Sequence, residues 1–248
     1  MNLIIDIGNS MIKAALVQDG QVLCVERYGS AQELDSSLLF ERYQELTKAI
    51  VASTGVPTAP IAEMLRQKGV PYVLEMTSLT PVPIGNDYLT PESLGVDRLA
   101  AAVGAMEIAQ GQDCLIVDFG TAITIDLVQD GVFKGGNISP GVELRFKALR
   151  DYTSRLPKCE ATDEVLDFGG NTVQAIEQGV MQGITNEIEG YISKIYAINV
   201  NLLIIFTGGD AKYFVKRIKN AIFAKYDLVI CGLNRILEYN AKTEQEDI

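Results

Sequence analysis

The sequence contains no histidine among its 248 residues. Histidine is the usual general base near neutral pH and a frequent zinc ligand, and it completes the Ser–His and Cys–His pairs of hydrolases. Any base for a substrate hydroxyl must therefore be a carboxylate. The four cysteines, Cys24, Cys114, Cys159 and Cys231, are far apart and form no Cys-x-x-Cys pair, so they are typical of reduced, mostly buried thiols.

Two common nucleotide-binding signatures are also missing. No Gly-x-Gly occurs in the chain, so the dinucleotide-binding fingerprint fails at its first step. No Gly-Lys occurs either, which excludes a Walker phosphate loop. A nucleotide, if the protein binds one, must be held by another device.

Positive charge is scarce, with 21 Lys and Arg against 32 Asp and Glu and a net charge of −11. This balance, without a basic stripe or a helix-turn-helix signal, predicts no nucleic-acid partner, although a local pocket could still bind a small anion. The N-terminal segment lacks the basic region of a signal peptide. No apolar run approaches the ~20 residues that span a bilayer. We expect a cytoplasmic protein without a membrane partner.

A repeated motif at the end of two apolar runs is the most informative feature of the sequence. The apolar residues 3–5 precede Asp6, and the apolar residues 115–117 precede Asp118. In both places the aspartate begins an Asp-x-Gly motif. Such glycines let backbone N–H groups approach an anion, and the acid can hold a hydrated cation. Each aspartate could instead only start a turn. The repetition, with a strand, an Asp-Gly turn and a second strand after each motif, favours duplication and a shared function.

The order of the expected elements predicts the fold class. Both halves read as a β-β-β meander followed by α/β units, which is the order of a ribonuclease-H-like, or actin-like, domain. We expect two such domains, 1–110 and 111–248, with a nucleotide cleft between them. Residues 77–94 read as a long, ordered, docked loop. Patterns predict helices over 31–43, 59–67, 99–110, 142–150, 172–198, 211–221 and 233–239, and a late strand over 227–230.

Residues 95–98 come just before an alanine-rich helix. Asp97 could be the carboxylate base, or it could only cap the helix. Arg98 could form a bidentate contact with a carboxylate or a phosphate. Lys13 could pair with a transferring phosphate, or it could be an ordinary outward-pointing strand lysine.

Two glycine pairs precede helices later in the chain. The pair at 169–170 comes before Asn171 and Thr172, which could cap the helix or leave its N-terminus to bind a ligand carboxylate. The pair at 208–209 follows a buried strand, where it would permit close approach of an adenine or a ribose. A simple strand-to-helix turn explains the second pair equally well.

Taken together, these motifs resemble those of type III pantothenate kinases almost end to end. The Gly-x-Asp-Arg block at 95–98 after the tyrosine-containing loop, followed by Asp-x-Gly-Thr-Ala-x-Thr at 118–124, is specific to that family. The remaining matches are the segments 6–13, 135–141, 171–172 and 207–210.

The resemblance implies transfer of the γ-phosphate of ATP to the primary hydroxyl of pantothenate, the first step of coenzyme A synthesis. It implies Mg²⁺ with ATP, a monovalent cation (K⁺ or NH₄⁺) at Asp118, Asp97 as the proton acceptor, and a homodimer with close helix packing at Gly179 and Gly183. The pantothenate-binding residues it implies are Tyr88, Gly95, Val96, Asp97, Arg98 and Thr172. The ATP-binding residues it implies are Asp6, Ile7, Gly8, Asn9, Ser10, Met11, Ile12, Lys13 and Thr121.

Two other functions remain open. Another actin-like kinase could act on a sugar or small alcohol and would not need Arg98. A non-catalytic regulator could use the same fold, but we would expect it to lose Asp6, Asp97 or Asp118, and all three are present.

Overall fold

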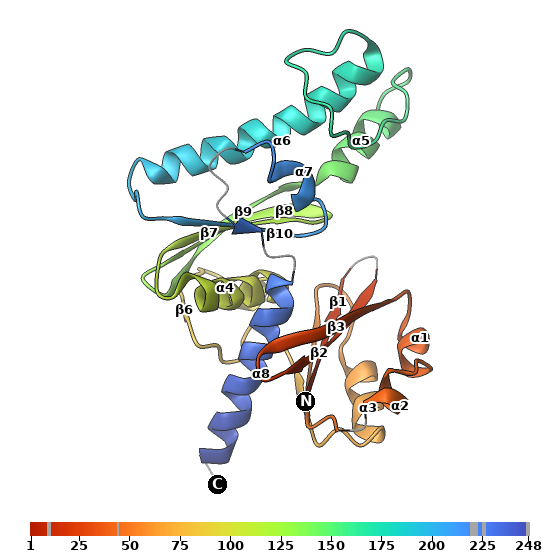
Figure 1. The fold of residues 1–248 in the computed structure, drawn as a ribbon, viewed down its shortest axis with the longest axis vertical. Helices are drawn as coiled ribbons and strands as arrows, with labels where there is room; N and C mark the ends of the chain where they lie inside the picture. The colour runs from red at the N-terminus through yellow and green to blue at the C-terminus, as the bar shows by residue number, and fades with distance from the viewer. Residues whose placement is uncertain (9–10, 44, 219–222, 225–226, 247–248) are drawn as a thin grey trace. The chain divides into compact units, whose positions relative to one another are not determined.

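The computed structural model describes residues 1–248 except 9–10, 44, 219–222, 225–226 and 247–248 (Figure 1). The chain forms two compact units. Unit 1 consists of Met1–Ile108 together with Leu228–Ile248, and unit 2 consists of Ala109–Asp227.

Unit 1 is built on a five-stranded sheet in the order β3-β2-β1-β4-β5. The first three strands form an antiparallel meander, and β4 and β5 continue parallel to β1. Alternate residues of β1, such as Leu3 and Ile5, are fully buried against the helices on one face. The strands are β1 (Asn2–Ile7), β2 (Ile12–Gln18), β3 (Gln21–Tyr28), β4 (Lys48–Ser53) and β5 (Tyr72–Glu75).

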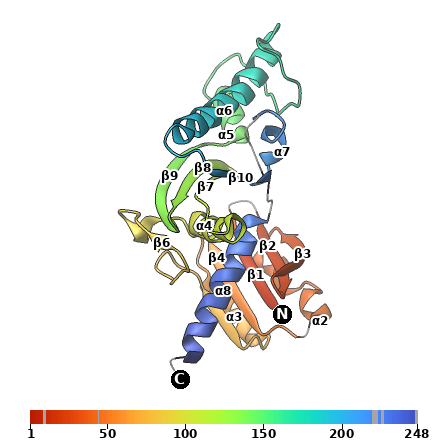
Figure 2. The ribbon, with the colours of Figure 1, turned by 60° about the vertical axis from the view of Figure 1, so that its left-hand side comes forward.

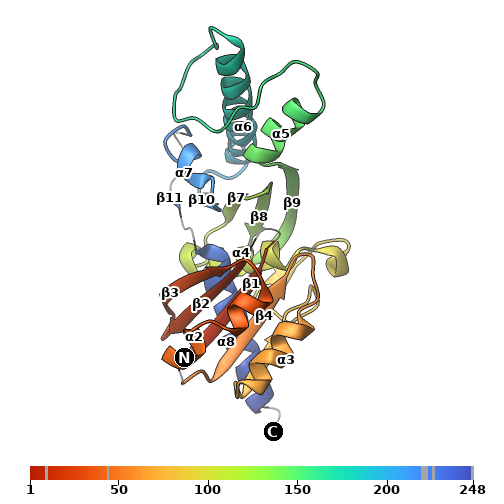
Figure 3. The same cartoon turned by 90° about the vertical axis from the view of Figure 1, so that its right-hand side faces the viewer.

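Helices lie on both faces of this sheet, as Figures 2 and 3 show for α3 and α8. The single helix expected over 31–43 is wrong, because the chain forms two short helices separated near Ser36, whose hydroxyl donates to the Gln32 carbonyl at 2.9 Å. Such side-chain bonds to the backbone compete with helix continuation. The helices of unit 1 are α1 (Ala31–Asp35), α2 (Leu39–Arg42), α3 (Ala59–Gln67), α4 (Val96–Ala109) and α8 (Leu228–Glu246).

Helix α8 packs with unit 1 although it is the last element of the chain. Lys48 of β4 pairs with Glu238 at 2.7 Å, and the Asn2 amide donates to the same carboxylate at 2.6 Å. A Cβ on Gly104 would lie 2.4 Å from the Leu228 carbonyl oxygen, so this glycine permits close packing of α4 on α8. Helix α8 therefore belongs to unit 1. The sequence instead predicts a second domain that runs without interruption over 111–248.

The strand expected over 227–230 is wrong, because α8 begins at Leu228. Gly232 interrupts the apolar residues near the start of α8, and its low helix propensity makes the sequence there read as a strand followed by a short helix. A Cβ at Gly232 would lie 1.8 Å from the carbonyl oxygen of Ala100, so tertiary packing, not local propensity, requires glycine at this position.

The loop 77–94 has little regular structure, only the short strand β6 (Gly85–Asn86) and the 3-10 helix η1 (Pro91–Ser93). It is attached to α8, since the Asn240 amide donates to the Pro81 carbonyl at 2.9 Å. Ser78 also closes the loop on itself by donating to the Glu92 carbonyl at 3.0 Å. The apolar side chain of Leu89 in this loop is 98% exposed, so it does not help to dock the loop.

Unit 2 repeats the meander of unit 1. Strands β7, β8 and β9 are antiparallel, and β10 and β11 continue parallel to β7, in the order β11-β10-β7-β8-β9. Figure 1 shows α5, α6 and α7 together on one face of this sheet. The strands are β7 (Cys114–Phe119), β8 (Ala122–Gln129), β9 (Val132–Pro140), β10 (Leu203–Thr207) and β11 (Phe223–Ala224).

The core of unit 2 lies between its sheet and its helices. In α6 one face is buried at Ile176, Val180, Ile184 and Ile188, whereas Val173 is 42% exposed. The helix expected over 211–221 is wrong in length, because it ends at Phe214; residues 219–221 lie outside the described part of the chain. The helices are α5 (Val142–Asp151), α6 (Thr172–Tyr196) and α7 (Ala211–Phe214).

The side chains of the four cysteines are free thiols. Cys114 and Cys159 are buried and the other two are partly exposed. Burial raises the pKa of the Cys114 thiol to about 12, so this group stays protonated and unreactive. Among the described residues, no helix is both long and apolar enough to cross a membrane.

Candidate active site

The first strand-end motif closes the β1–β2 hairpin of unit 1. The register places Asp6 directly opposite Lys13, and the Lys13 ammonium lies 3.2 Å from Oδ2 of Asp6. The Gly8 N–H donates to the Met11 carbonyl at 3.1 Å and closes the loop. Asp6 is only 8% exposed, so its charge is compensated locally by Lys13. Asn9 and Ser10 lie outside the described residues.

The second motif closes the β7–β8 hairpin of unit 2 in the same way. The register places Asp118 opposite Thr124, and the Gly120 N–H donates to the Ala122 carbonyl at 3.2 Å. Thr121 is exposed at the tip of this hairpin. The two hairpins therefore have equivalent backbones, but threonine stands opposite the aspartate in unit 2 where unit 1 has lysine.

Two glycines from later in the chain shape the second hairpin. Gly208 has φ +89, and a Cβ there would lie 2.4 Å from Oδ1 of Asp118. Gly141 donates its N–H to the Thr121 carbonyl at 3.0 Å, and a Cβ there would lie 2.2 Å from the Gly120 carbonyl oxygen. Only glycine fits at either position, so the 135–141 and 207–210 motifs hold the hairpin from two sides.

Asp97 lies in the first turn of α4, one residue beyond the first helical position, and not at the N-cap. Its Oδ1 accepts the Arg98 N–H at 2.9 Å. Burial raises the pKa of Asp97 above its ordinary value, the Arg98 N–H opposes this effect, and the negative charge of Asp6 raises it further. A desolvated carboxylate with a raised pKa is a better base than an exposed one.

The neighbours of Asp97 restrict its position. A Cβ at Gly95 would lie 2.5 Å from Oδ1 of Asp97, so glycine leaves room for the carboxylate. Arg98 is 6% exposed, and its guanidinium lies over the Tyr88 ring, 5.5 Å from the ring centroid. The structure thus brings together four of the expected pantothenate-binding residues of unit 1, namely Tyr88, Gly95, Asp97 and Arg98. Val96, buried, is the first residue of the same helix.

Thr172 is the first residue of α6 in unit 2 and is exposed. The capping interpretation holds for its neighbour, since the Asn171 side chain accepts the Gln174 N–H at 3.0 Å. Gln174 in turn accepts the Gly170 N–H at 3.1 Å, which satisfies a second backbone donor at this end of the helix. Thr172 does not serve as the cap, and its side chain is exposed.

Each hairpin brings a single aspartate to the end of its first strand. Mg²⁺ is usually held by one or two carboxylates together with substrate phosphates, not by a cage of protein acids. The described ranges contain no group of three or more His, Cys, Asp or Glu side chains that could hold a metal ion. A Cβ on Gly208 would lie 2.4 Å from Oδ1 of Asp118 and 2.6 Å from the Phe119 carbonyl oxygen, so both oxygens lie close to this glycine.

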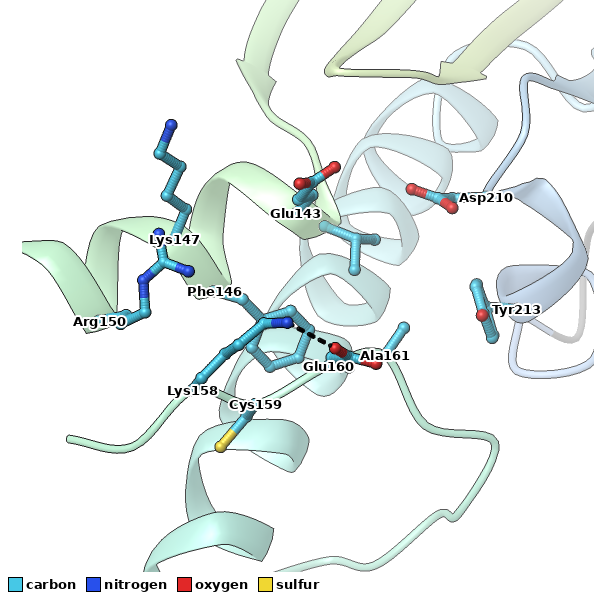
Figure 4. Close-up of a pocket in the computed structure, with 11 residues that line it drawn as sticks. Glu143, Phe146, Lys147, Arg150, Lys158, Cys159, Glu160, Ala161, Asp210 and Tyr213 are labelled. Carbon is cyan, nitrogen blue, oxygen red and sulfur yellow. Dashed lines mark ion pairs between the residues drawn. The ribbon is translucent and has the colours of Figure 1, made fainter.

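Sequence reasoning missed a cavity in unit 2 (Figure 4). It is formed by α5, residues 158–161 and α7, three segments that are distant in the sequence and carry no recognisable motif. Only the interpretation of the 208–209 glycine pair as a site of close approach for adenine or ribose pointed to this region.

Comparison with known proteins gives one consistent result. The sequence profile of the family described as "Type III pantothenate kinase" matches residues 2–194. A type III pantothenate kinase of Phocaeicola vulgatus is 44% identical over 245 residues, covering 98% of this chain and 100% of that protein. One from Porphyromonas gingivalis strain W83 is 40% identical, covering 96% of this chain and 98% of that protein.

Solved structures of low sequence identity share the fold. A Campylobacter jejuni protein, described as a candidate Baf family transcriptional activator, has a TM-score of 0.66 at 21% identity, covering 97% of this chain and 99% of that chain. The activator of 2-hydroxyisocaproyl-CoA dehydratase from Clostridium difficile, with bound ADPNP, has a TM-score of 0.57 at 12% identity, with 100% and 97% covered. MreB5 of Spiroplasma citri, bound to ADP, has a TM-score of 0.53 at 13% identity, with 100% and 98% covered. The predicted actin-like fold class is thereby confirmed.

Proposed function

This chain belongs to the type III pantothenate kinase family, and we propose that Asp97 is the base with which it phosphorylates pantothenate. The reaction transfers the γ-phosphate of ATP to pantothenate, in the pathway to coenzyme A. The observation that carries the proposal is the desolvated carboxylate of Asp97, in a chain that has no histidine to serve as base.

Asp97 accepts the proton of the primary hydroxyl of pantothenate. The hydroxyl oxygen forms a bond to the γ-phosphorus, the bond from that phosphorus to the β–γ bridging oxygen breaks, and ADP leaves. Because phosphoryl transfer passes through a loose transition state, the base has to orient the hydroxyl more than to remove its proton early. The Arg98 N–H bond and the space at Gly95 hold the carboxylate for this role.

Arg98 supplies the positive charge for the carboxylate of pantothenate. A guanidinium forms two parallel hydrogen bonds with a carboxylate, and the Tyr88 ring supports its orientation. Val96 and Gly95 form the backbone beside it. In unit 2, Thr172 offers a hydroxyl to the same substrate.

The nucleotide contacts follow the two hairpins. In unit 1 they include Asp6, Gly8 and Lys13, and in unit 2 they include Thr121. Lys13 balances phosphate charge. Mg²⁺ would accompany ATP, and Asp118 would hold a K⁺ or NH₄⁺ ion that would supply further positive charge to the reaction.

We place the active protein in the cytoplasm as a homodimer. The outward side of α6 supports the dimer, because a Cβ at Gly179 would meet no described atom within 4 Å. A Cβ at Gly183 would approach only the Arg145 guanidinium, at 3.9 Å. These small residues leave α6 free to pack closely against a second copy.

The test is a transfer assay with purified protein, ATP and Mg²⁺, in which pantothenate is compared with a panel of sugars in K⁺ or Na⁺. We expect turnover of pantothenate that depends on K⁺. Turnover only of sugars would support the alternative actin-like kinase, and no turnover of any acceptor would support a regulator.

A further inference from the structure

Arg145 is the fourth residue of α5, and it joins the end of β9 to α6. Its Nε donates to the Pro140 carbonyl at 2.8 Å, and its Nη2 lies 3.3 Å from the Ser139 hydroxyl. The same Nη2 pairs with the Glu187 carboxylate of α6. Because side chains on a helix lean toward its N-terminus, Arg145 can reach back to residues that precede its own helix.

The end of β9 needs these donors because its own backbone offers few. Pro140 lies opposite Ala122 of β8, and proline has no N–H to donate to that neighbour, so the last pair of the ladder is weakened. Gly141, the N-cap residue of α5, has no side chain with which to cap the helix. The connection between β9 and α5 is therefore held in place by the guanidinium of Arg145.

This connection also supports the Asp118 hairpin. The Gly141 N–H donates to the Thr121 carbonyl at 3.0 Å. A Cβ on Gly141 would lie 2.2 Å from the Gly120 carbonyl oxygen and 2.5 Å from that of Thr121, so the two segments pack backbone against backbone. A shift of Gly141 would therefore move the tip of the hairpin with it.

The pair of Arg145 with Glu187 suits this mechanical role. The two side chains are 22% and 25% exposed, so solvent screens the pair less than an open surface pair. Arg150 of the same helix shows the contrast, because it pairs with its neighbour Asp151 and both side chains are more exposed. Only a planar guanidinium can direct donors in a fixed fork to three separate acceptors, which a lysine cannot do.

We propose that Arg145 is a positioning residue for phosphoryl transfer. It fixes Pro140 and Gly141, and Gly141 in turn holds the Thr121 tip where the hairpin meets ATP. Glu187 orients the guanidinium for this task. The inference rests on the proposed function, since it assumes that Thr121 contacts ATP, and it adds a residue that acts on the nucleotide through the backbone of the hairpin.

The test measures KM for ATP, KM for pantothenate and kcat in the wild type, Arg145→Met and Arg145→Lys. We expect Arg145→Met to raise KM for ATP by about 3- to 10-fold, roughly the loss of one hydrogen bond from a charged donor. KM for pantothenate should stay unchanged, and kcat at saturating ATP should change less than KM for ATP. Arg145→Lys should recover part of the loss, because an ammonium group keeps the charge but not the fork.

The matched control is Arg235→Met, which removes another arginine that joins two helices. Arg235 of α8 pairs with Glu107 of α4 at 3.0 Å, in unit 1. This variant should keep the wild-type KM for ATP. Equal increases of that KM in Arg145→Met and Arg235→Met would overturn the proposal.

Calorimetric titration with ATP and Mg²⁺ gives a readout that needs no turnover, and urea unfolding of the same samples measures stability. We expect weaker ATP binding by Arg145→Met than by Arg235→Met. An Arg145→Met that is less stable but binds ATP as the wild type does would show a merely structural role and overturn the proposal. If Arg145→Met does not fold, Arg145→Lys serves for the same comparison.

The two proposals can fail separately. If ATP binds to the wild type and more weakly to Arg145→Met, but pantothenate is not phosphorylated, the proposed function fails and the role of Arg145 stands. If pantothenate is phosphorylated and both arginine variants bind ATP as the wild type does, the proposed function stands and the role of Arg145 is overturned.

Discussion

The hairpins that end β1 and β7 have the same construction but differ in the residue opposite the aspartate. Asp6 faces Lys13 in unit 1, whereas Asp118 faces Thr124 in unit 2. The first hairpin thus brings its own ammonium group to its carboxylate. The second has a threonine at the opposite position of the register, and Gly208 packs closely against its aspartate. The two hairpins therefore differ in one respect: unit 1 pairs its aspartate with a lysine, whereas unit 2 has a threonine opposite its aspartate and a glycine packed against it. In line with the proposal above, we predict that the cation binds at the second hairpin.

The largest effect should come from a residue outside both hairpins. We expect Asp97→Asn to lower kcat for pantothenate by about 10²- to 10⁴-fold, because the amide cannot accept the hydroxyl proton. Steady-state kinetics with saturating ATP would measure this. Turnover near that of the wild type would show that Asp97 only supports the first turn of α4. The base would then have to be another carboxylate, with the hairpin aspartates as the next candidates.

The difference between the hairpins can be tested without turnover. K⁺ bound to the folded protein should raise its Tm above the value in equal Na⁺. We expect Asp118→Asn to abolish this difference and Asp6→Asn, the matched variant of the other hairpin, to keep it. Thermal unfolding in the two salts is the measurement. Loss of the K⁺ effect in Asp6→Asn alone would move the cation site to unit 1.

We expect substitution by alanine to destabilise the protein more at Gly208 than at Gly209. An alanine there would need positive φ and would place Cβ 2.4 Å from Asp118, so we expect Gly208→Ala to cost roughly 1–3 kcal/mol of unfolding free energy. Gly209→Ala is the control, since a Cβ at Gly209 meets no described atom within 4 Å. Urea unfolding of both variants gives the comparison, and equal costs would remove Gly208 from the support of Asp118.

We expect the smallest effect for the change in unfolding free energy that Asp97→Asn causes. Since the folded-state pKa of Asp97 is raised, its ionisation destabilises the fold as pH rises through that pKa, and each pKa unit corresponds to ~1.4 kcal/mol. Asp97→Asn should therefore be more stable than the wild type at neutral pH, with a gain that disappears below the ordinary pKa of Asp. Urea unfolding across pH measures this, with the exposed Glu92→Gln as control. A variant no more stable at neutral pH would contradict the desolvation of Asp97.

Much of the fold could be predicted because its signals are local. The bounds of β3, β4, β5 and α3 follow directly from alternation, turns and helical periodicity. The errors arose where tertiary contacts override local signals. Gly232 interrupts α8 in the sequence because α4 packs against it, and residues 227–230 then look like a strand.

The candidate site likewise has parts that local sequence predicts and parts that only the folded structure reveals. Both hairpins are short contiguous motifs and could be recognised from the residues alone. The position of Asp97 inside the first turn of α4, and the raised pKa that burial gives it, depend on packing around that turn. The cavity beside Phe146 and Tyr213 joins three distant segments, so no window of the sequence could reveal it.

The role of Asp97 is tested most directly by the pH dependence of kcat/KM for pantothenate in the wild type and in Asp97→Asn. The wild-type value should fall at acid pH through a single ionisation above the ordinary pKa of Asp, because the base must be unprotonated. The value for the variant should be low and lack that ionisation. A variant with the same acid limb as the wild type would show that another group accepts the proton and would contradict the assignment.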